Sequence, residues 1–175
     1  MKTNKLTRCA LFAAMALIIH VVESFLPPLF PIPGIKIGIA NIITLAAVYI
    51  LGNKEAFLIL MVRIILGNMF TGQVTSLIYS LCGGVLCYIV TIALKRFFKG
   101  NTIWFLGVMG AIAHSIGQTA CACVLFCSMS FVYYGAVMCI FSCVSGTLTG
   151  FCSQFMVKHF LKIKEKNNED SIYMQ

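Results

Sequence analysis

The chain has 175 residues, of which 60% are apolar and only 10% are charged. Soluble domains carry about 25% charged residues, so thirteen basic and five acidic side chains cannot cover a core of this hydrophobicity in water. The mean hydropathy of +0.96 excludes a soluble globular protein and predicts an integral membrane protein. The formal charge of +8 comes from basic residues at the ends of apolar stretches, which membrane topology explains without nucleic-acid binding.

Breaks in the apolar pattern delimit the predicted helices, because a helix surrounded by lipid and other helices is apolar on all sides. We predict six transmembrane helices, at about residues 9–26, 36–51, 56–70, 74–94, 103–127 and 131–157. The proline-rich segment 27–34 ends the first, because proline cannot continue a helix. The expected fold is an all-α polytopic membrane protein, with a single six-helix domain over residues 1–157 and a polar cytoplasmic tail over residues 158–175.

The apolar stretch that follows Arg8 is expected to stay in the protein as the first span. It continues to Leu26 and, unlike a secretory signal peptide, has no small-x-small cleavage site before Pro27. The nine cysteines all lie in apolar stretches, where they are expected to act as small packing residues rather than as a disulfide, redox or metal framework.

The distribution of basic residues predicts the orientation. Six spans place both termini and the segments after the second and fourth spans on one side of the membrane. Eleven of the thirteen basic residues lie in those segments: Lys2, Lys5, Arg8, Lys54, Lys95, Arg96, Lys99, Lys158, Lys162, Lys164 and Lys166. Because lysine and arginine accumulate in cytoplasmic segments, this side is expected to be cytoplasmic.

Ionisable residues within the spans are candidates for function, since a charge at the bilayer centre costs about 2.5–3.5 kcal/mol on insertion scales. Arg63 lies in the third span, Glu23 at the outer end of the first, and Lys36 at the outer start of the second. Two interpretations stay open. Glu23 pairs with Lys36 or Arg63 as a structural ion pair, or Lys36 and Arg63 hold a solute that carries a carboxylate or phosphate.

Polar side chains elsewhere in the spans have the same two interpretations. His114 and Gln118 lie one helical turn apart, on a face with several small residues that is expected to contact protein rather than lipid. They are either satisfied interior groups or solute ligands, and so are Asn41 and Asn68. The candidate substrate-binding residues are therefore Glu23, Lys36, Asn41, Arg63, Asn68, His114 and Gln118.

Two small-residue spacings indicate helix packing. Ala10 and Ala14 form an A-x-x-x-A pattern, while Ser142, Gly146 and Gly150 repeat at every fourth residue. Small side chains let two helices approach closely. Each pattern serves either packing within the chain or docking of a partner.

No enzyme motif is found in the sequence. It has no Walker A loop, no H-E-x-x-H, no G-x-S-x-G and no aspartate-rich cluster that would hold magnesium diphosphate, and its one aspartate is Asp170 in the tail. We expect no catalytic activity, no cofactor and no metal site.

The residues described so far resemble the Gx transporter family, also labelled heptaprenyl diphosphate synthase component I. The resemblance covers about residues 5–157 and is carried by segments 23–27, 31–42, 63–67 and 110–118. That family is similar to the substrate-binding S components of energy-coupling factor (ECF) transporters. The resemblance implies a six-helix protein of the bacterial plasma membrane that binds a vitamin-like nutrient from outside and works with a membrane coupling subunit and cytoplasmic ATPases.

The resemblance also implies that Ala10 and Ala14 dock the coupling subunit. Three functions remain open: the S component of a transporter, a membrane accessory subunit of heptaprenyl diphosphate synthase, and another membrane role such as a subunit of a redox complex. For the first, we expect a pocket near the outer face, capped by the proline-rich segment and the break between the third and fourth spans.

Overall fold

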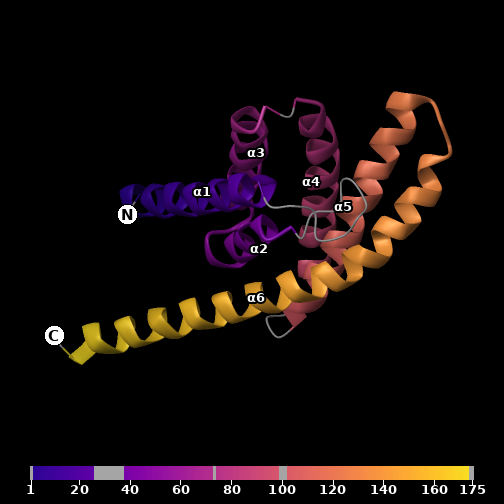
Figure 1. Ribbon diagram of the computed structural model, residues 1–175. Coiled ribbons are helices and arrows are strands. Elements are labelled where there is room, and N and C mark those ends of the chain that lie inside the picture. Colours follow the sequence, from indigo (N-terminus) through magenta and orange to yellow (C-terminus); the bar gives the residue numbers. More distant parts are fainter. Residues whose placement is uncertain (1, 26–37, 73, 99–101, 174–175) are drawn as a thin grey trace.

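The computed structural model describes residues 2–25, 38–72, 74–98 and 102–173, and within these it contains six α-helices and no β-strand. The all-α fold is confirmed. The helices are α1 (Lys2–Phe25), α2 (Ala40–Ile50), α3 (Asn53–Phe70), α4 (Val74–Lys95), α5 (Ile103–Phe126) and α6 (Phe131–Tyr173) (Figure 1).

Residues with positive φ mark several helix ends. Gly52, directly before α3, has φ = +113°, and its N–H donates to the carbonyl of Ala47 in α2 at 3.2 Å. Gly72 has φ = +67° after α3. Both conformations strain a residue with a Cβ atom, so glycine allows the chain to turn immediately. Cys127 ends α5 in the same left-handed region, with φ = 48°, although it is not glycine.

In the described part of the chain, four helices contain stretches long and apolar enough to cross a membrane: Thr3–Phe25 in α1, Ser76–Lys95 in α4, Ile103–Phe126 in α5 and Phe131–Lys166 in α6. At about 1.5 Å per residue, the 11 residues of α2 measure about 16 Å, roughly half of a hydrocarbon layer of about 30 Å. The 18 residues of α3 include three charged side chains, Lys54, Glu55 and Arg63.

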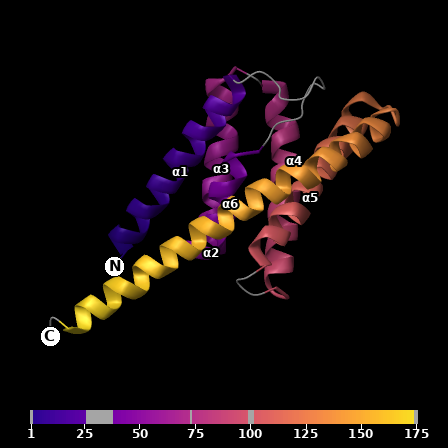
Figure 2. The same cartoon turned by 60° about the horizontal axis from the view of Figure 1, so that its bottom comes forward.

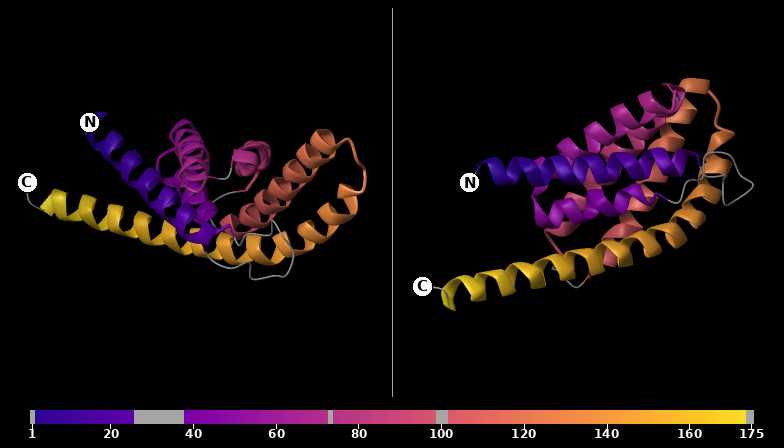
Figure 3. Two further views of the ribbon diagram at one scale, coloured as in Figure 1. Left: turned by 45° about the horizontal axis from the view of Figure 1, so that its top comes forward. Right: turned by 60° about the vertical axis from the view of Figure 1, so that its left-hand side comes forward.

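Helix α6 continues well beyond the predicted end of the sixth span. It has 43 residues, and residues 158–173 are helical. Figures 1 and 3 show its C-terminal part projecting past the other helices. A helix of this length measures about 64 Å, which is about twice the thickness of the hydrocarbon layer.

Helix α5 packs against both α4 and α6, whereas α1, α2 and α3 pack on one another, with α2 also contacting α6 (Figure 3). Close packing depends on small residues. A methyl group added to Gly107 of α5 would lie 2.5 Å from Cα of Gly150 and 2.8 Å from the carbonyl oxygen of Gly146, both in α6. The repeated small residues of α6 therefore pack within the chain, one of the two roles that the spacing left open.

Polar contacts join the helix ends at one end of the molecule, which we call the basic end. Lys5 of α1 forms an ion pair with Glu55 of α3, with 2.5 Å between Nζ and Oε1. The hydrogen bond from Lys5 lowers the pKa of the Glu55 carboxyl below its ordinary value. Lys95, the last residue of α4, donates to the carbonyl of Val48 at 2.7 Å and to Oδ1 of Asn53 at 3.3 Å.

The two termini lie toward this same end of the structure, and consecutive helices run in alternating directions (Figures 2 and 3). The guanidinium carbon of Arg8 lies 5.9 Å from the ring centroid of Phe160, which brings the start of α1 to the later part of α6. Several of the basic residues grouped in the sequence analysis are thus close together in space.

A cavity in the half of the protein away from the basic end

A cavity of about 570 Å³ lies among the six helices. Its walls come from the last turns of α1, the start of α2 with Gly38, the middle of α3, the first half of α4, the second half of α5 and the first half of α6. Because the helices alternate in direction, these segments share one half of the molecule, and the basic end occupies the other.

Five of the seven predicted binding residues line this cavity: Glu23, Asn41, Arg63, His114 and Gln118. Lys36 lies outside the described residues. Asn68 does not line the cavity; it is 1% exposed, and its Nδ2 donates to the carbonyl of Ile64, one turn earlier in α3, at 2.7 Å. The tertiary structure thus brings together side chains from α1, α2, α3 and α5 that are up to 95 positions apart in the sequence, from Glu23 to Gln118.

Arg63 is the buried cation of the cavity, with only 4% of its surface exposed. Its Nη1 donates to Oδ1 of Asn41 at 2.9 Å, and its Nε has no partner among the described residues. A guanidinium carries five N–H donors and no acceptor. The protein therefore satisfies only part of this group, which is costly in a buried position.

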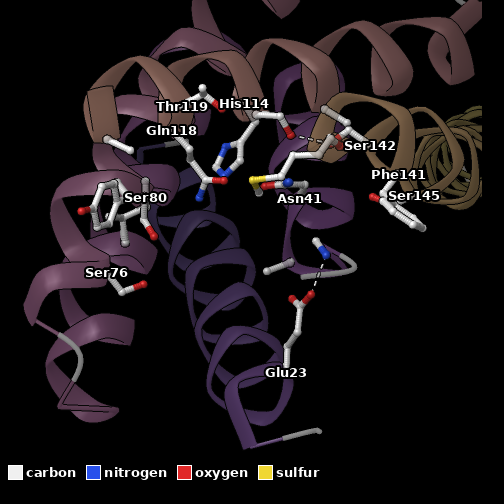
Figure 4. A pocket seen from close by; sticks show the side chains of 18 of the residues that line it. Glu23, Asn41, Ser76, Ser80, His114, Gln118, Thr119, Phe141, Ser142 and Ser145 are labelled. Carbon is white, nitrogen blue, oxygen red and sulfur yellow. Dashed lines mark hydrogen bonds between the residues drawn. The ribbon is translucent and has the colours of Figure 1, made fainter. Parts of the chain in front are cut away.

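Glu23 and Arg63 form no ion pair with each other in the part of the chain that the structure describes. Glu23 accepts a hydrogen bond through Oε1 from the backbone N–H of Gly38, at 2.5 Å (Figure 4). Gly38 has φ = +75°, which favours glycine and places its N–H just before α2. In place of the predicted structural ion pair, Glu23 is hydrogen-bonded to Gly38 and Arg63 is hydrogen-bonded to Asn41. The alternative pair of Glu23 with Lys36 lies outside the described residues.

His114 and Gln118 project from α5 into the cavity (Figure 4). The opposing helix α4 has a glycine at this level. A methyl group on Gly83 would lie 2.8 Å from the carbonyl oxygen of His114 and 2.9 Å from Cγ of Gln118. Nδ1 of His114 and Oγ1 of Thr119 are buried without a partner among the described residues. The small residue on α4 lets α5 approach closely while its polar side chains line the cavity.

The first half of α6 forms a wall that sequence reasoning missed. Most of its lining residues recur every three or four positions, as one face of a helix does: Phe131, Tyr134, Met138, Phe141, Ser145 and Leu148, with Ser142 and Val144 beside them. Ser115 and Ser142 are hydrogen-bonded to each other across α5 and α6, and Oγ of Ser142 also contacts the carbonyl of Met138 at 2.8 Å. A helix that is apolar on all sides gives no signal of the face that lines a cavity.

Ala10 and Ala14 are both exposed on α1, so neither is covered by another helix of this chain. The described residues contain no cluster of three or more histidine, cysteine, aspartate or glutamate side chains that could hold a metal ion.

The described residues are folded into α-helices, four of which contain apolar stretches of membrane-spanning length, so the chain is an integral membrane protein, here with a largely apolar cavity that several polar side chains line. Residues 12–156 match the family model described as heptaprenyl diphosphate synthase component I, and the chain belongs to that family. No curated protein and no solved structure matches the chain.

Proposed function

We propose that this protein is the substrate-binding S component of an ECF-type transporter, which imports a small nutrient or vitamin-like solute and is itself not an enzyme. Its six helices lie in the bacterial plasma membrane with both termini in the cytoplasm. The observation that carries this proposal is the cavity of about 570 Å³, lined by charged and amide side chains, in the half away from the basic end.

The size and position of the cavity support solute binding from outside. Pockets for small molecules commonly measure about 300–1,000 Å³ and combine an apolar lining with a few placed polar groups. The basic end faces the cytoplasm by the positive-inside rule, so the cavity lies in the outer half of the protein. The short α2 is mostly buried among other helices, which reduces the length of apolar surface that it must present to lipid. Helix α3 keeps one apolar face exposed, with Phe57, Leu58 and Ile65.

The exposed pair of alanines on α1 supports a partner in the membrane. Ala10 and Ala14 leave room for a second helix backbone to approach α1. We assign this surface to the coupling subunit, and we assign ATP hydrolysis to separate cytoplasmic ATPases.

Co-purification tests this assignment. The tagged protein is expected to retain a membrane coupling protein and ATPases, and the double variant Ala10→Leu, Ala14→Leu should lose them while keeping its thermal stability. Ala120→Leu with Ala136→Leu is the matched control, because these alanines are also exposed but lie on α5 and α6. If the coupling protein and ATPases are absent from the wild-type preparation, the transporter assignment is wrong.

The family description favours a second candidate, a membrane accessory subunit of heptaprenyl diphosphate synthase. Glu23 is the one carboxylate that lines the cavity among the described residues, whereas magnesium diphosphate is held by clustered carboxylates. In this role the chain would associate with a synthase rather than catalyse the reaction. Retention of a soluble prenyl transferase in the same co-purification would support this candidate.

A further inference from the structure

The cavity has two chemically different sides (Figure 4). Helices α1, α2, α3 and α5 contribute the polar side chains Glu23, Asn41, Arg63, His114 and Gln118. The facing part of α6 contributes mainly rings and aliphatic side chains, among them Phe141, together with the hydroxyl groups of Ser142 and Ser145. A ligand that fills both parts therefore has a polar end and an apolar body.

The polar side has more hydrogen-bond donors than the protein uses. Arg63 makes a single hydrogen bond within the described residues, to Asn41, so most of its N–H groups have no acceptor there. The Asn41 amide oxygen is occupied by this bond, which leaves its NH₂ group as a donor. Within the described part of the chain no carboxylate lies at hydrogen-bonding distance from Arg63, because Glu23, which lines the same cavity, is bonded to Gly38 instead. An anionic group on the ligand would match these donors.

The apolar side is held in a fixed position relative to the polar side. The hydrogen bond between Ser115 and Ser142 joins α5 to α6 within the cavity wall. Further along, Gly107 and Gly150 bring the same two helices into backbone contact. The wall around Phe141 is therefore a preformed surface, and flat rings bind well to such surfaces at little conformational cost.

We propose that the cavity takes an amphipathic organic anion, with its carboxylate or phosphate at Arg63 and Asn41 and a ring-containing apolar body against the α6 wall. This inference rests on the proposed solute-binding function and deepens it by naming the ligand class. Arg63 supplies the charge and Asn41 positions its guanidinium, while His114 and Gln118 contact the junction between the anionic group and the ring.

Binding to the full-length protein in phosphatidylcholine nanodiscs tests the proposal. The probes are 2-naphthoate, its neutral analogue 2-naphthamide, decanoate as an anion with a flexible chain, and acetate as an anion without a body. Naphthoate is expected to bind about tenfold or more tightly than each of the others. The neutral lipid keeps anionic headgroups out of the measurement, and decanoate distinguishes a ring from a fatty acyl chain.

Variants test which residues bind the anionic group and which bind the ring. Arg63→Gln should abolish the preference for naphthoate over naphthamide, and Arg63→Lys should retain part of it. Arg96→Gln is the matched control, because Arg96 is exposed after the end of α4 and far along the chain from the cavity lining. Phe141→Ala should weaken both ring compounds about equally. Thermal unfolding of each variant shows whether it is folded. If Arg63→Gln does not fold, the binding of the four probes to Arg63→Lys and to the wild-type protein decides whether the cavity prefers an anion.

Native mass spectrometry of the protein purified from its host separates this inference from the proposed function. A retained aromatic acid or phosphate supports both. A retained sugar or cation, or equal binding of naphthoate and naphthamide, overturns the ligand class and leaves solute binding standing. If no small molecule is retained and no probe binds, solute binding itself is wrong.

Discussion

Replacing Gly107 with alanine should weaken the contact between α5 and α6. The new methyl carbon would lie 2.5 Å from Cα of Gly150, whereas carbon atoms pack at about 3.5–4.0 Å, so the helices must separate by about 1 Å. Overpacking of this kind costs about 1–3 kcal/mol, and the better helix propensity of alanine returns about 1 kcal/mol. Because the atoms that the methyl group meets, Cα of Gly150 and the carbonyl oxygen of Gly146, belong to the backbone, we expect an overpacking cost in the upper part of this range and a net loss of about 1–2 kcal/mol.

Gly110 provides the control on the same helix. A methyl group there would meet Sγ of Cys87 and Oγ1 of Thr91, each at 3.1 Å, and these side-chain ends can move by a few tenths of an ångström. Gly110→Ala should therefore change stability by less than about 1 kcal/mol. Unfolding can be followed through Trp104, the only tryptophan, which stacks on Phe151 of α6. Equal stability of the two variants would refute the reasoning.

Three further predictions concern the basic end and the orientation. Because the pKa of Glu55 is lowered, its pairing with Lys5 stabilises the fold at pH values above the ordinary carboxyl pKa, and this contribution is lost as pH falls through the lowered pKa. The stability difference between wild type and Glu55→Gln should therefore be larger at neutral pH than under strongly acidic conditions. Equal differences at the two pH values would contradict this prediction. Lys95→Met removes two hydrogen bonds from a partly exposed ammonium, and chemical unfolding should show a loss of about 1 kcal/mol. With the other eight cysteines replaced by serine, a membrane-impermeant thiol reagent should label Cys127, between α5 and α6, in intact cells. A protein with all nine cysteines replaced by serine and with Lys166→Cys should not be labelled, and labelling of that variant would place the tail outside.

The helix boundaries were largely predictable from the sequence because glycine, proline and small polar residues interrupt the apolar stretches. The predicted fourth and fifth spans differ from α4 and α5 by a single residue at one end. The predicted boundaries differed most from the structure where the chain is polar but still helical. Residues 158–173 are polar but helical, because lysine and glutamate are good helix formers that need no lipid.

The candidate site was most predictable where a residue is costly to bury, although the predicted amides Asn41 and Gln118 line the cavity as well. A buried arginine, a glutamate and a histidine are rare enough within apolar spans to be selected from composition, and Arg63, Glu23 and His114 do line the cavity. Asn68 had the same appearance in the sequence, yet its amide binds the carbonyl of Ile64 in its own helix. Spacing does not distinguish an amide that satisfies its own helix from one that lines a cavity.

The sequence by itself determined the class of protein, the approximate helix boundaries and the grouping of basic residues, because these depend on transfer free energies and backbone preferences that act locally. Only the tertiary structure decided that Arg63 bonds to Asn41 rather than to Glu23, and that one face of α6 closes the cavity. Those outcomes depend on the rotation of each helix about its axis, which is set by small residues such as Gly83 and Gly107 in contact with a neighbouring helix. A single apolar stretch contains no information about that neighbour.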